Sequence, residues 1–167
     1  RFEEQGVVFV DSIDEVPQGS PIMLSAHGSA PDVVADAETT GSFTVNSVCP
    51  LVTKVHHEVR VRVGKGFRVI YVGHEGHEEA VGTMAVAPDA IDRVESVADV
   101  AALPDFDEPL ALLAQTTLSH RDWSDVADAA ERDAEQEGGA DAESSAIHGA
   151  ARQGRQLREG AHLCYRL

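Results

Sequence analysis

Thiol, imidazole, carboxylate and hydroxyl groups gather in four short segments of this chain, and each segment follows an apolar run typical of a buried strand. The four segments are residues 25–28, 49–56, 73–79 and 115–119. Ligands of an open α/β sheet bind beside the carboxyl ends of its strands. The placement therefore predicts one functional site that is assembled from several strand ends.

Cys49 is the one cysteine within these segments, and Pro50 directly after it begins a predicted helix. The partial positive charge of a helix N-terminus favours the thiolate form of a cysteine. A metal ion or an iron–sulfur cluster requires a thiolate, so Cys49 is a candidate ligand. A buried structural cysteine is the alternative, because that is the commoner fate of a lone cysteine.

His74, His77 and Glu79 lie in the segment that follows the predicted strand at residues 67–72. Two imidazoles in a loop that leads into a helix suit a phosphate group, and Glu79 would then move protons. The alternative is a zinc site formed by the same three side chains. It is disfavoured because the two histidines are three residues apart, not four as in the helical zinc motif.

Two further strand ends add an imidazole and two hydroxyls. His27 precedes Gly28, which allows a ligand to approach the backbone closely. Thr116 and Thr117 follow the apolar run at residues 110–114, and a binding role is weighed against the general preference of threonine for strands. The remaining histidines are interpreted as surface or structural residues: His56, His57, His120, His148 and His162.

Alternating apolar runs and amphipathic segments predict an α/β fold of βαβ units with a mostly parallel sheet. Strands are predicted at residues 7–10, 21–25, 43–48, 67–72, 94 and 110–114. Helices are predicted at residues 31–40, 50–63, 77–86, 96–103 and from 119 toward 137. Between Val126 and Leu157 the only large aliphatic residue is Ile147, so residues 137–156 are expected to be flexible or weakly helical.

The composition excludes several classes of partner. The net charge of −16 would repel nucleic acid and anionic membranes. No stretch approaches the roughly 20 apolar residues of a membrane span, and the opening residues 1–4 do not resemble a signal peptide. Two cysteines far apart in the sequence are unlike a secreted disulfide framework. A cytoplasmic protein is therefore expected.

The segments together resemble the 4-hydroxy-3-methylbut-2-enyl diphosphate reductase family. The resemblance covers about residues 3–130, in family order and with family-like gaps. The segments that carry it are Ser25-Ala-His-Gly28, Cys49-Pro-Leu-Val-Thr-Lys-Val-His56, Gly73-His-Glu-Gly-His-Glu-Glu79, Gly82-Thr-Met84, Val94-Glu-Ser96 and Gln115-Thr-Thr-Leu-Ser119. Those around Cys49 and Gln115 are the most specific.

The resemblance implies a three-lobed α/β reductase in which three cysteines hold a 4Fe-4S cluster. By this resemblance, the cluster would bind the alcohol oxygen of the substrate through its open iron and would pass two electrons to it, so that the hydroxyl leaves as water. The implied products are isopentenyl and dimethylallyl diphosphate, which serve isoprenoid biosynthesis by the non-mevalonate pathway. Ferredoxin or flavodoxin is the implied electron donor. No nucleic acid or membrane partner is implied.

The same resemblance implies roles for single residues. Cys49 would be a cluster ligand, and Cys164 in Leu163-Cys-Tyr165 resembles a second one. Glu79 would deliver protons to the leaving hydroxyl, and Thr116 would orient the substrate. The diphosphate would be held by His27 and His77, in a pocket that Thr117 also lines.

The implied division of the chain has three parts. Residues 1–49 are expected to be a remnant of the first α/β lobe, residues 50–133 a complete central lobe, and residues 134–167 a divergent, flexible tail that is first acidic and then basic.

The chain also departs from the family pattern. The glycine-rich loop with the first cluster cysteine is absent, and Glu78 stands where the family usually has proline. We therefore expect this chain alone to hold no stable cluster and to be inactive. The alternative is a truncated, inactive relative that keeps only the fold or weak diphosphate binding. The zinc hydrolase is least favoured, because it leaves the segments around Cys49 and Gln115 unexplained.

Overall fold

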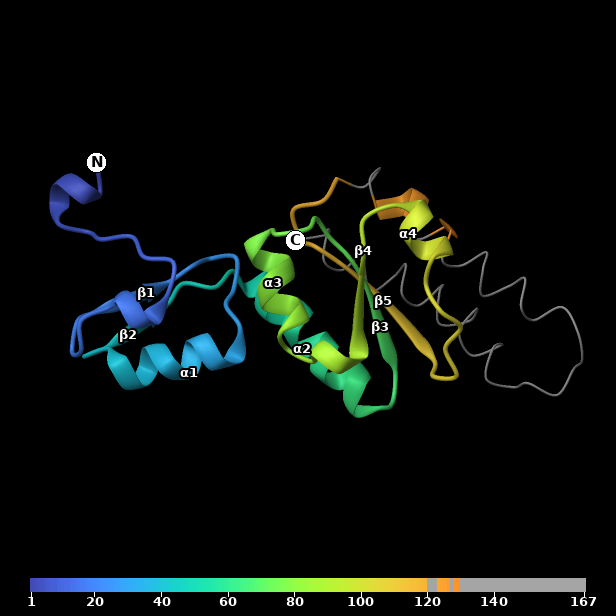
Figure 1. Cartoon of the computed structure of the whole chain (residues 1–167), viewed down its shortest axis with the longest axis horizontal. Helices are drawn as coiled ribbons and strands as arrows, with labels where there is room; N and C mark the ends of the chain where they lie inside the picture. The colour runs from blue at the N-terminus through green and yellow to red at the C-terminus, as the bar shows by residue number, and fades with distance from the viewer. Residues whose placement is uncertain (120–122, 127, 130–167) are drawn as a thin grey trace, which may run out of the picture.

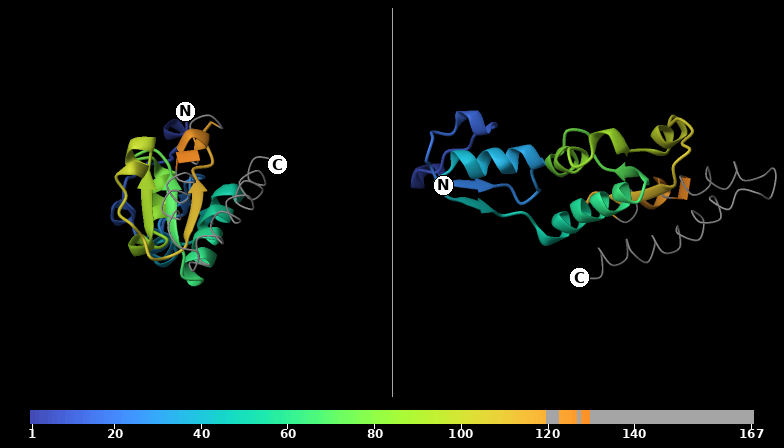
Figure 2. Two further views of the ribbon diagram at one scale, coloured as in Figure 1. Left: turned by 90° about the vertical axis from the view of Figure 1, so that its right-hand side faces the viewer. Right: turned by 90° about the horizontal axis from the view of Figure 1, so that it is seen from below.

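The computed structural model describes residues 1–119, 123–126 and 128–129. These residues form two lobes that follow one another along the chain, each with its own parallel sheet. Figure 1 shows the smaller lobe around strands β1 and β2 and the larger lobe around β3, β4 and β5. The views of Figure 2 show that the lobes lie end to end in an elongated molecule.

The larger sheet has the strand order β4-β3-β5, and all its strands are parallel. β3 (Arg68–Val72) lies in the middle, between β4 (Ile91–Val94) and β5 (Leu110–Ala114). Helix α3 (Glu78–Met84) connects β3 to β4, and α4 (Val97–Ala101) connects β4 to β5. Both connections are βαβ units, so the predicted α/β class with parallel pairing is confirmed.

Apolar residues of β3 alternate between two cores because successive side chains of a strand point to opposite faces. Val69 and Tyr71 pack in one core with residues of α2 (Pro50–Gly64) and α3, whereas Ile70 and Val72 pack in the other with Val100 of α4. The strand is therefore covered on both faces, which explains its continuous apolar sequence.

Helix α2 (Pro50–Gly64) supplies most of the cover on the first face. Its valines recur at helical spacing, and Val52, Val55 and Val59 are buried. Pro50 occupies the first turn, where a missing N–H costs nothing. The predicted helix and its apolar stripe are thus confirmed.

The smaller lobe consists of β1 (Ile22–Leu24), β2 (Thr44–Asn46) and α1 (Pro31–Thr40). Ile22 and Leu24 pack against Ala37 of α1. The opposite face of this sheet carries Met23, which is 73% exposed, and Val45, which is 46% exposed. Only one face of the smaller sheet is therefore buried within the described residues.

One predicted strand is wrong. Residues 7–10 form no strand, and Val8 and Phe9 are exposed. A strand requires a pairing partner, and the described residues place none beside this segment. The predicted strand at residues 43–48 is shorter than expected, since β2 ends at Asn46.

The short elements η1 (Glu3–Gln5), η2 (Ile13–Glu15) and η3 (Pro88–Ala90) are single 3-10 turns. In the described part of the chain, no helix is long and apolar enough to cross a membrane. The expected flexible segment at residues 137–156 lies outside the described residues, as does Cys164. The three-lobed architecture and the domain boundaries remain predictions.

Candidate functional site

The candidate site lies where the carboxyl end of the larger sheet meets the loop after β1. Helix α3 begins there, and His77 is its N-cap residue, with Nδ1 accepting a hydrogen bond from the Glu79 backbone N at 3.1 Å. His77 therefore has a structural function as a helix cap. The bond also means that Nδ1 of His77 carries no proton, which leaves Nε2 as the donor of the neutral ring.

Glu79 is fully buried and is bonded twice to Thr116 at the end of β5. Its Oε1 accepts from the Thr116 backbone N at 2.7 Å, and its Oε2 accepts from Thr116 Oγ1 at 2.9 Å. A carboxyl group inside a protein requires such partners. The two residues are 37 positions apart in sequence, so the sheet and α3 together create this contact.

Gln115 organises the same edge of the sheet, a function that the sequence reasoning missed. Its side chain is 1% exposed. The Oε1 atom accepts from the His74 backbone N at 3.0 Å, and Nε2 donates to Thr117 Oγ1 at 2.6 Å. Gln115 thereby joins the loop after β3 to the loop after β5. A polar residue directly after an apolar strand was the one signal available for it.

His27 reaches the site from the smaller lobe. Its ring lies edge-on to the ring of His77, with centroids 5.4 Å apart. His27 Nδ1 lies 3.0 Å from Oε2 of Glu78, the first residue of α3, and Ser25 Oγ donates to the same oxygen at 2.8 Å. The hydrogen bond from His27 is the main reason that the pKa of Glu78 lies below its ordinary value.

Gly28 has protein on the side where a side chain would lie. A Cβ atom there would lie 2.9 Å from Val52 Cγ1 and 3.2 Å from His56 Cε1. A Cβ atom at Gly82 of α3 would in turn lie 3.3 Å from the Gly28 carbonyl carbon. The missing side chain of Gly28 thus lets the two lobes approach closely, while the approach of a ligand to its backbone stays a prediction.

His56 is buried below this loop, with 7% of its surface exposed. Its Nε2 atom has no hydrogen-bond partner among the described residues. Burial, helped by the charge of Arg60, holds the pKa of His56 below its ordinary value. Of the two earlier alternatives for His56, the structural one is confirmed and the surface one is wrong.

Cys49 precedes α2 and is a free, half-buried thiol. Its backbone N donates to the Ala26 carbonyl at 2.9 Å, which ties it to the loop that carries His27. The residue type and the helix N-terminus suit a thiolate ligand. Within residues 1–119, 123–126 and 128–129, however, it is the only cysteine, and no three His, Cys, Asp or Glu side chains gather as a metal site.

The zinc alternative receives no support from these positions. Nδ1 of His74 lies 2.9 Å from Glu95 Oε1, while His77 caps α3. Arg93 also binds Glu95, at 3.0 Å. The hydrogen bond from His74 is the largest cause that lowers the pKa of Glu95. His74 thus belongs to an ion-pair cluster between β3 and β4, apart from the bonds that join Glu79 to Thr116.

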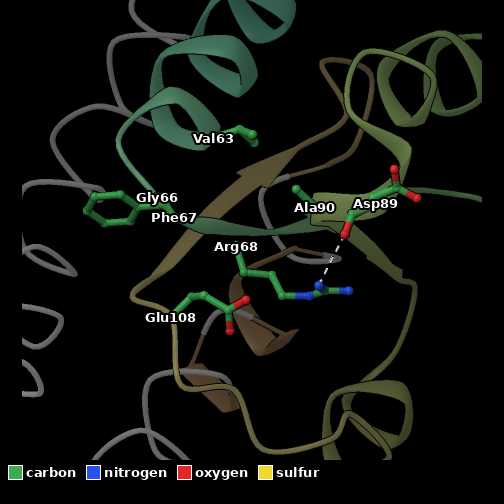
Figure 3. A pocket seen from close by; sticks show the side chains of 7 residues that line it. All are labelled: Val63, Gly66, Phe67, Arg68, Asp89, Ala90 and Glu108. Carbon is green, nitrogen blue, oxygen red and sulfur yellow. Dashed lines mark hydrogen bonds between the residues drawn. The ribbon is translucent and has the colours of Figure 1, made fainter.

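A surface hollow of about 200 Å³ lies at the opposite, amino end of β3 (Figure 3). Arg68 Nη1 donates to the Asp89 carbonyl at 3.2 Å, and the guanidinium also pairs with Asp92. The hollow is lined by Val63, Gly66, Phe67, Arg68, Asp89, Ala90 and Glu108. None of the site residues predicted from the sequence lines it.

Comparison with known proteins identifies related sequences. The family model described as "LytB protein" matches residues 1–156. A 4-hydroxy-3-methylbut-2-enyl diphosphate reductase of Corynebacterium diphtheriae is 48% identical over 118 residues, which cover 70% of this chain and 35% of that protein. The corresponding protein of Rhodopirellula baltica is 50% identical over 121 residues, which cover 71% of this chain and 37% of that protein.

Solved structures of reductases also superpose on this chain. The E-1-hydroxy-2-methyl-but-2-enyl-4-diphosphate reductase of Plasmodium falciparum superposes with a TM-score of 0.74 at 31% identity, over 78% of this chain and 42% of that one. A second reductase structure, at 16% identity and a TM-score of 0.61, supports the fold alone. This chain spans 35% and 37% of the length of the two relatives compared above.

Proposed function

This chain belongs to the LytB protein family, and from that premise we propose that it forms part of a reductase acting on 4-hydroxy-3-methylbut-2-enyl diphosphate. One observation carries the proposal. Buried Glu79 is bonded twice to Thr116, and the adjacent residues of α3 meet His27 at the same edge of the sheet. A paired acid and hydroxyl beside two imidazoles suit proton transfer next to a bound anion.

We assign the diphosphate to His27 and His77. The two rings come from different lobes and lie edge-on to each other, with centroids 5.4 Å apart. Because Nδ1 of His77 accepts the bond from the Glu79 amide, the neutral His77 ring has its N–H at Nε2 and can donate to a phosphate oxygen. Thr117 is an exposed residue whose hydroxyl accepts from Gln115; it follows Thr116 directly and is assigned to the same pocket.

We assign proton delivery to Glu79 and Thr116. The Thr116 hydroxyl donates to Glu79 Oε2, so its oxygen lone pairs remain available to the hydroxyl group of a substrate. When Glu79 is protonated, its carboxyl O–H would donate to Thr116 Oγ1, which reverses this bond and lets the Thr116 hydroxyl point its own proton at the substrate hydroxyl. Thr116 would then give that proton to the leaving hydroxyl and take the proton of Glu79 in its place. Burial keeps the Glu79 carboxyl from bulk water, and half-buried Thr116 lies between it and the proposed substrate position, which suits protonation of a leaving hydroxyl.

An iron–sulfur cluster, when bound, supplies the two electrons of such a reduction. Cys49 fits one ligand position by residue type and by its place before α2. The described residues offer no second thiolate, so the remaining ligands would come from elsewhere, and Cys164 is our candidate for one. A ferredoxin or flavodoxin donor and a cytoplasmic location complete the proposal.

A second candidate function is that of an inactive relative. Cys49 is the only thiol among the described residues, and one thiolate does not complete a cluster. On this second proposal the chain keeps only the fold or weak diphosphate binding, without catalysis. Turnover of 4-hydroxy-3-methylbut-2-enyl diphosphate by the chain alone, after anaerobic addition of iron and sulfide, would overturn it. Cys49→Ala in parallel tests whether any bound iron requires this thiol.

The test of the diphosphate site is calorimetric titration with 4-hydroxy-3-methylbut-2-enyl diphosphate and with the alcohol that lacks the diphosphate. His77→Asn keeps a side-chain acceptor for the cap of α3 but removes the imidazole. We expect it to weaken binding of the diphosphate about 10-fold, as loss of one hydrogen bond to a charged group does. His57→Asn, at an exposed position of α2, is the control. Equal binding by both variants would contradict the assignment.

A further inference from the structure

Glu78 is placed so that its carboxylate faces the proposed anion site. It is the first residue of α3, and its side chain is 67% exposed. Its Oε2 atom lies 3.0 Å from Nδ1 of His27 and accepts from Ser25 Oγ at 2.8 Å. A residue at the start of α3 is thereby bonded to two residues of the loop after β1.

The contact between Glu78 and His27 occupies the Nδ1–H group of His27, which could otherwise donate a hydrogen bond to an anion. An ionised carboxylate can only accept hydrogen bonds, so Nδ1 of His27 carries the proton in this pair. In the neutral ring Nδ1–H is then the only N–H, and Glu78 occupies it. In the protonated ring Nε2–H becomes free, but the carboxylate cancels the positive charge. In both states, an anion finds less attraction than an unpaired imidazole would offer.

The charges around Glu78 support this reading. The groups that lower its pKa are Ser25, His27 and His77, and the hydrogen bond from His27 is the largest cause. His27 and His77 are also the rings to which we assign the diphosphate. The carboxylate is therefore held by the same groups that would hold the ligand.

Accepting the proposed diphosphate site, we propose that Glu78 is a tethered competitor for it: its carboxylate occupies His27 and must give way when a diphosphate binds. Glu78 then determines how tightly this chain binds anions and which ones displace it. A diphosphate, which carries more charge than a carboxylate, displaces Glu78 more readily than a monocarboxylate ligand does.

The experiment measures the affinity of inorganic pyrophosphate by calorimetry for the wild type, Glu78→Gln and Glu78→Pro. Proline suits the first position of a helix, and His77 already has the extended backbone that precedes a proline (φ −69°, ψ 133°). We expect both variants to bind about 10-fold more tightly at low salt, because a negative charge next to the anion is removed. The gain should shrink at high salt.

Glu75→Gln is the matched control. Glu75 lies three residues earlier, in the loop that leads into α3, and has the same charge, but its side chain is 85% exposed and pairs with Arg93 at 3.5 Å. We expect less than about a 2-fold change for this variant, since the partner of Glu75 is Arg93 and not one of the two imidazoles assigned to the anion. If Glu75→Gln and Glu78→Gln raise the affinity for pyrophosphate equally, the effect depends only on the net charge of the protein, and the proposal is overturned.

A second measurement follows Glu78 itself by carbon NMR of its carboxyl group. Saturating pyrophosphate should raise the pKa of Glu78 toward its ordinary value, because His27 is taken from it. The pKa of Glu95, which is lowered mainly by His74, should move less and serves as the internal reference. An unchanged pKa of Glu78 in the bound protein would overturn displacement.

The outcomes separate the two proposals. Wild-type binding that Glu78→Gln and Glu78→Pro leave unchanged, or weaken, would overturn the function of Glu78 and leave the diphosphate site standing. Absence of pyrophosphate binding in all variants would overturn the diphosphate site and this inference with it. Circular dichroism of each variant verifies that the fold is retained.

Discussion

The position of His27 depends on a buried residue beneath its loop, His56. His56 contacts no candidate ligand position, yet its imidazole packs against Gly28 next to His27. Its burial keeps the neutral form in the folded protein, since the charged form would lose hydration without gaining a partner for Nε2. Protonation of His56 at low pH should therefore destabilise the packing of the loop after β1.

His56 gives a prediction for stability against pH. Its folded pKa is lowered, so between that pKa and the ordinary value near 6.5 the unfolded chain binds more protons. The free energy of unfolding then falls as the pH drops below about 6.5, by at most about 1.4 kcal/mol per pH unit for one proton. We expect His56→Leu to lose less stability than the wild type between pH 7 and pH 5 in urea titrations.

His57→Leu is the control for that experiment, because His57 lies on the exposed side of the same helix. It also loses one imidazole but leaves the buried site unchanged. If the two variants show the same dependence of stability on pH, His56 does not carry the effect.

The sequence predicted which residues gather at the site, but it did not predict the hydrogen bonds between them. The rule that ligands lie at strand ends placed His27, His77, Glu79 and Thr116 at one edge, and the structure brings these four together. Their functional roles remain predictions. The bond between His27 and Glu78 depends on how two sheets sit relative to each other, which no local pattern encodes.

At the scale of elements, helices and central strands were predictable and the edge of the smaller sheet was not. The valine spacing of α2 and the apolar run of β3 are local signals. Residues 7–10 carry the same apolar signal as a strand, but pairing decides whether a strand forms. Helix starts were equally clear, since Ser96 caps α4 through a capping box with Asp99.

The contact between the loop after β1 and helix α2 gives a second prediction, for the stability of glycine variants. Gly28 has φ +86° and its Cβ would meet Val52 Cγ1 at 2.9 Å, whereas Gly66 has φ +81° and nothing within 4 Å. Gly66→Ala should cost about 1–2 kcal/mol through backbone strain alone. Gly28→Ala adds a steric clash and should cost about 1 kcal/mol more. Urea unfolding of the two variants measures the difference.

Equal losses for the two alanine variants would contradict this prediction. They would mean that Val52 and His56 of α2 move aside without cost, and that the loop after β1 is not tightly seated. A substrate-affinity measurement on Gly28→Ala would then show whether His27 keeps its position.

At the scale of the whole molecule, the two lobes differ in how well they are covered. β3 is buried on both faces between helices. The smaller sheet has two strands, one buried face and a core of Ile22, Leu24 and Ala37. Two-stranded sheets are marginal by themselves, so the smaller lobe depends on its contacts with α2 and α3.

Hydrogen exchange should therefore separate the lobes. We expect the amides of β3 to exchange most slowly, through global unfolding, and the paired amides of β1 and β2 to exchange faster, through local opening. Mass spectrometry of peptides that cover residues 22–24 and 68–72 measures this. Identical protection of both strands would show that the lobes unfold as one cooperative unit.

The approach of Gly82 to Gly28 has a consequence for how this site tolerates sequence change. Backbone meets backbone there, with a hypothetical Cβ of Gly82 only 3.3 Å from the Gly28 carbonyl. His27 is the neighbour of one glycine, and His77 caps the helix that contains the other. Because neither residue has a side chain, the two backbones can approach this closely and bring the imidazoles together. Both positions are therefore expected to accept no larger residue, although neither carries a group that could do chemistry.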